Sequence, residues 1–148
     1  MTDPPSTGTW TEGVSTGGTL FANPLSLAAA RVTLEEVVTD DAYERAAALG
    51  ARLADGIERI AVDHDLDWSA HRLYNRSGYT HAPTLPANAI EARATLDLEL
   101  YNLQRIYMAN RGVWEAIDSA GPACGIHTAE EDVDRYLDIL DEYLGALT

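Results

Sequence analysis

The sequence predicts an α+β domain in which a small, mainly antiparallel sheet is covered by helices. Long segments with apolar residues at three- and four-residue spacing alternate with pairs of short segments of strand character. The 148 residues are 46% apolar, which fits one hydrophobic core. Residues 1–16 differ, because they are rich in Pro, Gly, Ser and Thr. We therefore expect an irregular arm over residues 1–16 and one domain over residues 17–148.

Two helices are expected directly after the arm. Asn23 followed by Pro24 is typical of a helix start, because Asn caps the free N–H groups and Pro fits the first turn. The first helix should span Leu25 to Val38. The second should begin near Asp40 and run to about Ala61, because one apolar stripe recurs at helical spacing: Tyr43, Ala46, Gly50, Leu53, Ile57 and Ile60.

The strands are expected in two pairs. Residues 68–74 and 77–81 should form the first pair, with Gly78 marking a bulge. Residues 113–117 and 124–126 should form two further short strands. Between the pairs, two prolines enforce a loop.

The remaining helices are expected over residues 87–94, over residues 96–110 and at the C-terminal end. The helix over 96–110 should end at Gly112 and bury Leu96, Leu100, Leu103 and Tyr107. The last helix should begin with a capping box of Thr128 and Glu131. It should run to about Leu147 and face inward through Val133, Tyr136, Leu137, Leu140 and Leu144.

Charge and composition exclude several classes of partner. The formal net charge is −14, so a polyanion such as DNA would be repelled. The apolar runs are too short for a membrane span, and the N-terminus has no secretory pattern. We expect a soluble cytoplasmic protein. Its single cysteine, Cys124, should be a small buried apolar residue.

Few polar residues form a pattern with chemical meaning. Asp63, His64, Asp65 and Asp67 have ligand types, but consecutive residues point apart, so we expect a solvated turn and no metal site. The three tryptophans, Trp10, Trp68 and Trp114, read as packing residues.

His71, His81 and Arg76 lie on or beside the first pair of strands. Neither histidine has a nucleophile at a useful spacing, so no hydrolase triad is predicted. Arg76 could bind a substrate carboxylate, although a surface ion pair explains it equally well.

Residues 17–30 read Gly-Gly-Thr-Leu-Phe-Ala-Asn-Pro-Leu-Ser-Leu-Ala-Ala-Ala. This block resembles the class-III pyridoxal-phosphate-dependent aminotransferases, and among them the glutamate-1-semialdehyde 2,1-aminomutase-like branch. Residues 108–113 (Met-Ala-Asn-Arg-Gly-Val) and 127–134 (His-Thr-Ala-Glu-Glu-Asp-Val-Asp) agree with it. The resemblance extends from Gly17 onward. It departs at Phe21-Ala22, where the family often has Ser-Gly, and at residues 121–125, where substrate-recognising residues are absent.

The resemblance implies the C-terminal small domain of a fold-type-I pyridoxal-phosphate enzyme. It also implies that Gly18 and Thr19 bind the cofactor phosphate held by a neighbouring subunit. Glycine permits close backbone approach, and the threonine hydroxyl and amide can both donate to phosphate oxygens. The reaction would be a transamination or an aminomutation on a small amino acid or amino-aldehyde.

The chain contains no lysine, and all ten of its basic residues are arginine. Pyridoxal phosphate chemistry needs a lysine amine, which a permanently protonated guanidinium does not replace. We therefore predict no catalytic residue in this chain and no activity by it alone. A complete assembly would be a homo-oligomer or would include a separately encoded large domain. The alternatives are a non-catalytic dimerisation or interaction domain and the remnant of a truncated gene.

Overall fold

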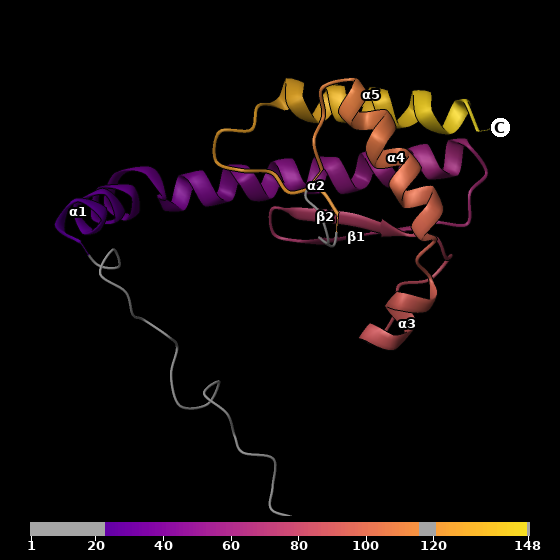
Figure 1. Ribbon diagram of the computed structural model, residues 1–148, viewed down its shortest axis with the longest axis horizontal. Coiled ribbons are helices and arrows are strands. Elements are labelled where there is room, and N and C mark those ends of the chain that lie inside the picture. Colours follow the sequence, from indigo (N-terminus) through magenta and orange to yellow (C-terminus); the bar gives the residue numbers. More distant parts are fainter. Residues whose placement is uncertain (1–22, 116–120, 148) are drawn as a thin grey trace, which may run out of the picture. The chain divides into compact units, whose positions relative to one another are not determined.

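The computed structural model describes residues 23–115 and 121–147 (Figure 1). Its elements are, in order, α1 (Pro24–Val32), a π-helical turn (Thr33–Val37), α2 (Asp40–Asp63), β1 (Ser69–Leu73), β2 (Arg76–Thr80), α3 (Ala89–Ala94), α4 (Leu98–Asn110) and α5 (Glu130–Gly145). The chain divides into two units after Thr39. The arm expected over residues 1–16 lies outside the described residues. The predicted α+β class is confirmed.

The first unit contains α1 and the π-helical turn. Asn23 caps α1 as predicted, since its side-chain Oδ1 accepts the Ser26 N–H at 3.0 Å. Thr33 ends the regular helix, and its hydroxyl donates to the Ala29 carbonyl at 2.8 Å. No residue of α1 or of the turn is buried.

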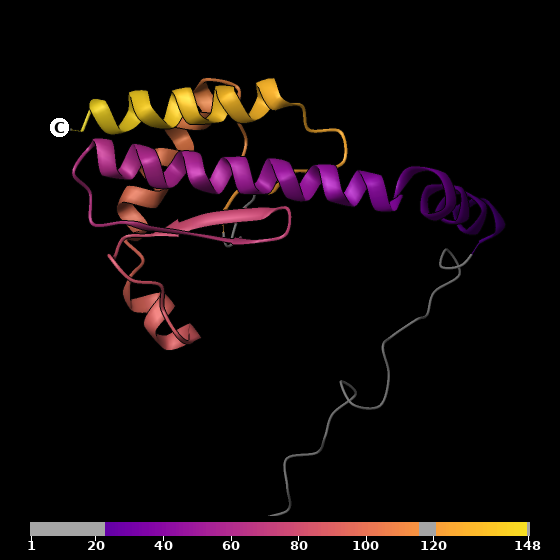
Figure 2. The same ribbon diagram turned by 180° about the vertical axis from the view of Figure 1, so that it is seen from behind.

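In the second unit, α2 lies between α5 on one side and the β1–β2 hairpin on the other (Figures 1 and 2). The predicted stripe of α2 is buried except for Tyr43, which is 61% exposed. Gly50 lets the hairpin approach closely, because a Cβ there would lie 2.6 Å from the Tyr74 carbonyl oxygen. The Ser77 hydroxyl donates to the Gly50 carbonyl at 2.6 Å and fixes this contact.

The β1–β2 hairpin confirms the first pair of strands within one or two residues. Its register is continuous from Ser69 opposite Thr80 to Leu73 opposite Arg76, so the predicted bulge at Gly78 is wrong. Gly78 instead lies at a close backbone contact with Gly121. A Cβ on Gly121 would lie 2.5 Å from the Gly78 Cα, so two backbones meet there with no side chain between them.

The second predicted pair of strands is wrong for the part of the chain described. Residues 113–115 and 124–126 form no strand, and the sheet there has two strands. Gly121 takes a φ of +101°, and Pro122 follows it, which breaks the extended run. What remains is an isolated bridge between Arg76 and Ala123, with the Cys124 N–H donating to the Asn75 carbonyl at 2.8 Å.

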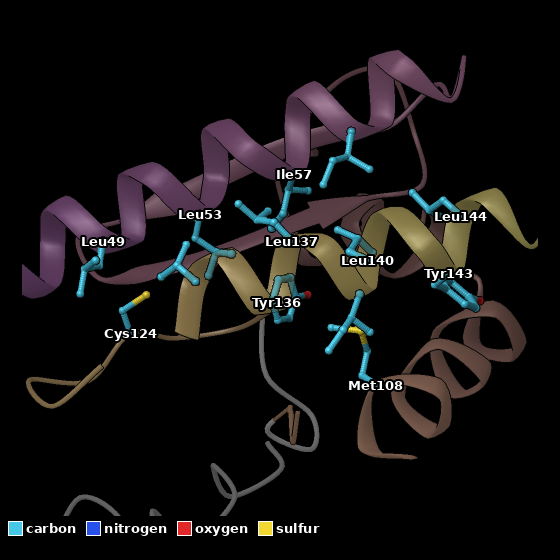
Figure 3. Close-up of a cluster of buried hydrophobic side chains, with 13 residues drawn as sticks. Leu49, Leu53, Ile57, Met108, Cys124, Tyr136, Leu137, Leu140, Tyr143 and Leu144 are labelled. Carbon is cyan, nitrogen blue, oxygen red and sulfur yellow. The ribbon is translucent and has the colours of Figure 1, made fainter. Parts of the chain in front are cut away.

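The core lies mainly between α2 and α5 and continues to α4 (Figure 3). The five predicted inward residues of α5 are all buried. On α4 the predicted face is confirmed in part, because Leu100 and Tyr107 pack against the core. Leu103 is 49% exposed, and Gln104 and Met108 are buried instead; Leu96 precedes the helix and is 44% exposed. No described helix is long and apolar enough to cross a lipid bilayer.

The helix ends are predicted unevenly. Gly112 ends α4 with a φ of +83°, as expected. The capping box of Thr128 and Glu131 is wrong, because Ala129 precedes α5 and its N–H donates to Asp132 Oδ2 at 2.9 Å. The Thr128 hydroxyl instead accepts the Gly125 N–H and closes a turn.

Candidate functional site

The two residues predicted to bind a phosphate, Gly18 and Thr19, lie outside the described residues. The structure begins at the helix start that follows them. There the Asn23 side chain accepts the Ser26 N–H, so this backbone N–H at the start of α1 already has a hydrogen-bond partner. The phosphate contact therefore stays a prediction.

Arg76, the predicted substrate residue, opens β2. Its backbone pairs with Leu73 in the hairpin and with Ala123 in the isolated bridge. The side chain is exposed, and among residues 23–115 and 121–147 it makes no ion pair. The structure thus places Arg76 at the turn end of the hairpin without bringing a second candidate residue to it.

A hollow of ≈ 610 Å³ lies between the hairpin and the segment that carries α3 and α4. Tyr79 and Tyr101 give it aromatic walls, and His71, Thr80 and Thr95 add polar ones. The rest of the lining is mostly apolar: Leu85, Pro86, Ala92, Leu96 and Leu98, with Gly121. Its size is that of small-molecule sites.

Behind the hollow, Trp68, Tyr79 and His81 form an aromatic stack. Trp68 and Tyr79 are nearly parallel with ring centroids 4.9 Å apart, and Trp68 lies 4.7 Å from His81. The Asp97 N–H donates to His81 Nδ1 at 3.0 Å and ties the start of α4 to the hairpin. Burial lowers the pKa of His81, against the opposing charge of Asp97, and so favours the neutral form of the ring. Trp68 packs as predicted, whereas Trp114 is 74% exposed.

A buried hydrogen-bond chain joins β2, α4 and α5. The Tyr79 hydroxyl donates to Gln104 Oε1 at 2.5 Å, and the Gln104 amide donates to Glu115 Oε1 at 3.4 Å. The Tyr136 hydroxyl donates to the same carboxyl oxygen at 2.5 Å. Gln104 is fully buried and Glu115 is 8% exposed. Burial raises the pKa of Glu115. The hydrogen bonds that Tyr136 and Gln104 donate to its carboxyl oppose that rise, because they favour the charged form.

Sequence reasoning missed Gln104 and Glu115. Gln104 lies four residues from both Leu100 and Met108, so it is a polar residue on an apolar helix stripe. Glu115 stands in an otherwise apolar stretch of residues 113–117. Each is a local exception that would have indicated a buried polar pair.

The described residues offer no activated nucleophile. Cys124 is free and buried as predicted, and burial raises the pKa of its thiol. His64 of the acidic turn contacts Asp141 of α5 at 2.7 Å. In residues 23–115 and 121–147 no three potential ligands gather around a metal position.

The chain is similar in sequence to glutamate-1-semialdehyde 2,1-aminomutases. It is 31% identical over 137 residues to that enzyme of Chloroflexus aggregans, a match covering 88% of this chain and 31% of the relative. It is 34% identical over 99 residues to glutamate-1-semialdehyde 2,1-aminomutase 2 of Geobacillus kaustophilus, covering 66% of this chain and 22% of the relative. The chain thus spans less than a third of the length of these relatives. No protein-family model matches it.

Comparison with solved structures also finds a glutamate-1-semialdehyde aminomutase and a transaminase. The crystal structure of a glutamate-1-semialdehyde aminomutase from Pseudomonas aeruginosa superposes with a TM-score of 0.83 at 32% identity. This match covers 89% of the present chain and 29% of that enzyme. A transaminase with pyridoxal phosphate bound shares the fold, with a TM-score of 0.66 at 23% identity. The chain therefore belongs to the class-III aminotransferase family, as a domain like the C-terminal part of the glutamate-1-semialdehyde 2,1-aminomutases.

Proposed function

We propose that this chain is the C-terminal domain of a pyridoxal-phosphate-dependent aminotransferase or aminomutase whose catalytic lysine lies outside these 148 residues. One observation carries the proposal: 89% of the chain superposes on the Pseudomonas aeruginosa aminomutase with a TM-score of 0.83 at 32% identity. A shared fold alone does not establish a shared function, but here the same match combines a similar fold with similar sequence.

The residues present do not fit a complete cofactor site. Covalent attachment needs a primary amine, and the chain has no lysine. The described residues that line the hollow include no lysine or arginine that would pair with a phosphate. The role proposed for this chain is therefore to complete a site assembled elsewhere, with Gly18 and Thr19 donating to the cofactor phosphate.

The proposed substrate is a small amino acid or amino-aldehyde, with Arg76 as the candidate partner of its carboxylate. A guanidinium matches a carboxylate through two parallel N–H donors. Arg76 is exposed at an edge held by the Ala123 bridge, which is where a second polypeptide can reach it. A homo-oligomer or a lysine-bearing large domain would supply that second surface.

The test is to tag this chain at its native locus, purify it, reduce it with borohydride and map the peptides by mass spectrometry. The expected result is a preparation that absorbs in the visible and carries a pyridoxyl-lysine peptide from outside residues 1–148. A preparation without cofactor would contradict the proposed function. An adduct on a side chain of these 148 residues would contradict the placement of the lysine.

A second candidate function, self-association without catalysis, is favoured by α1 and its π-helical turn. Their large apolar side chains Leu25, Leu27, Val32 and Leu34 are all 48% exposed or more. Apolar residues surround this helix on most sides, and such helices are normally covered. Arg31 pairs with Glu35 at 2.8 Å, so Glu36 is the one remaining acidic side chain of residues 24–37 that would oppose such a contact.

Light scattering across a dilution series tests this second function. If the chain associates through α1, Leu25→Gln with Leu34→Gln should shift it to the monomer. The control Val62→Gln, which changes an exposed apolar residue of α2, should not shift it. A wild-type chain that is monomeric at every concentration would rule out self-association.

A further inference from the structure

The carboxyl of Glu115 lies where three elements meet. Tyr136 reaches it from α5 and Gln104 reaches it from α4, and Gln104 in turn accepts a hydrogen bond from Tyr79 of β2. Glu115 and Tyr136 are at least nine-tenths buried, and Gln104 is completely buried. Three elements are thus cross-linked through one ionisable group rather than through apolar contacts alone.

The surroundings of Glu115 supply no bonded counter-ion in the described part of the chain. From α4, Arg105 acts on the carboxyl only through space, and its Nε is buried without a hydrogen-bond partner there. From α5, Asp132 and Arg135 lie nearby but bond to the Ala129 N–H and the Arg111 carbonyl.

Among residues 23–115 and 121–147, the other neighbours of Glu115 are neutral at ordinary pH. Leu53 faces it from α2, and the Cys124 thiol lies on the segment that follows. Tyr101 of α4 and Tyr143 of α5 extend the cluster of hydroxyls around Tyr79 and Tyr136. Within the described residues, a negative charge at Glu115 would therefore be compensated by two neutral donors, Tyr136 and Gln104, and by the through-space charge of Arg105.

We propose that Glu115 is a proton-dependent junction, whose neutral carboxyl holds β2, α4 and α5 together and whose ionisation loosens the packing of α4 against α5. The proposal does not depend on the proposed enzymatic function. It rests on a buried carboxyl, on donors from two helices, and on the absence of a bonded cation in the described residues.

The direction of the pH effect follows from burial. The folded-state pKa of Glu115 is raised above its unfolded value. Its contribution to stability is therefore fully present below the unfolded pKa and is lost as pH rises through the folded pKa. Glu142, whose pKa is lowered by its hydrogen bond from Arg111, and His81, whose pKa is lowered by burial, both change stability in the opposite direction. A matched variant is needed to separate these effects.

The variant is Glu115→Gln, which keeps the shape and both accepted hydrogen bonds but cannot ionise. Urea unfolding of wild type and variant, followed by circular dichroism from pH 5 to pH 8, should give curves that separate as pH rises. The ratio of their unfolding constants should grow roughly tenfold for each unit by which the pKa is raised. Glu58→Gln, an exposed carboxyl on α2, should show no such growth.

Two measurements on folded protein accompany the denaturation. Carbon-13 titration of the Glu115 carboxyl in wild type should give a pKa above that of ordinary glutamates. Amide exchange in α4, corrected for its intrinsic pH dependence, should accelerate with pH in wild type and not in Glu115→Gln. A ratio that stays constant with pH, or a Glu115 that titrates at or below the ordinary value, overturns the proposal. If Glu115→Gln does not fold, the wild-type titration alone decides.

Discussion

Tyr74 is one of two non-glycine residues in 23–115 and 121–147 that have a positive φ, and it has the larger side chain of the two. It closes the β1–β2 hairpin with a φ of +53°, a left-handed conformation that suits Gly and Asn and disfavours residues with a large side chain. Its side chain is 78% exposed, so packing does not offset this cost. The hairpin keeps Tyr74 in place because Gly50 and Ser77 bind the turn to α2.

We predict that Tyr74→Asn stabilises the protein by about 1 kcal/mol, because Asn tolerates the left-handed region. The measurement is the free energy of unfolding from chemical denaturation. The matched control is Tyr43→Asn, an exposed tyrosine within α2, which should be neutral or slightly destabilising. A loss of stability in Tyr74→Asn would show that the aromatic ring, rather than the backbone, matters at the turn.

Single residues also show where sequence reasoning ends. Asn23, Gly112 and Cys124 behave as predicted, since capping, helix termination and burial of a lone thiol are local properties. Gln104 and Glu115 were not predicted, because each is stabilised by a partner more than ten residues away. The Thr128 capping box was predicted wrongly for a different, local reason: the Thr128 hydroxyl accepts the Gly125 N–H, and the helix begins one residue later, after Ala129.

Elements with a long periodic stripe were predicted best. The helices α2 and α5 carry unbroken stripes, and each packs along its length against the other. The two additional strands were predicted wrongly because short apolar runs do not reveal whether a partner strand exists. In the described residues only the bridge at Arg76 and Ala123 remains of that second pair.

The contact between α2 and the hairpin depends on Gly50. A Cβ at that position would lie 2.6 Å from the Tyr74 carbonyl oxygen and 2.8 Å from the Asn75 Cα, and neither backbone atom can rotate away. We predict that Gly50→Ala lowers the free energy of unfolding by roughly 1–3 kcal/mol, the usual cost of overpacking. Thermal or urea unfolding measures this.

Gly145→Ala provides the control for Gly50→Ala. There the added Cβ would meet only His64 Cε1 at an ordinary 3.5 Å, within the last turn of α5. This variant should be neutral or gain stability from the better helix propensity of alanine. Equal effects of the two substitutions would mean that the hairpin moves freely on α2.

At the scale of the whole molecule, the chain is similar to only part of larger enzymes. The match to the Pseudomonas aeruginosa aminomutase covers 89% of this chain but only 29% of that enzyme. The first unit of this chain buries none of α1, and α3 likewise has no buried residue. The predicted family and α+β class are confirmed by these relatives, whereas the roles of Gly18, Thr19 and Arg76 stay predictions because they require a second polypeptide.

If this chain is a domain of a pyridoxal-phosphate enzyme, the absence of lysine leaves it without a side chain that binds the cofactor covalently. The most direct test incubates the purified 148-residue chain with pyridoxal phosphate, reduces it with borohydride and maps the adducts by mass spectrometry. No stoichiometric adduct is expected on any side chain, since the chain has no lysine and only its N-terminal amine can react. A stoichiometric adduct on a side chain, together with turnover of an amino donor, would contradict it.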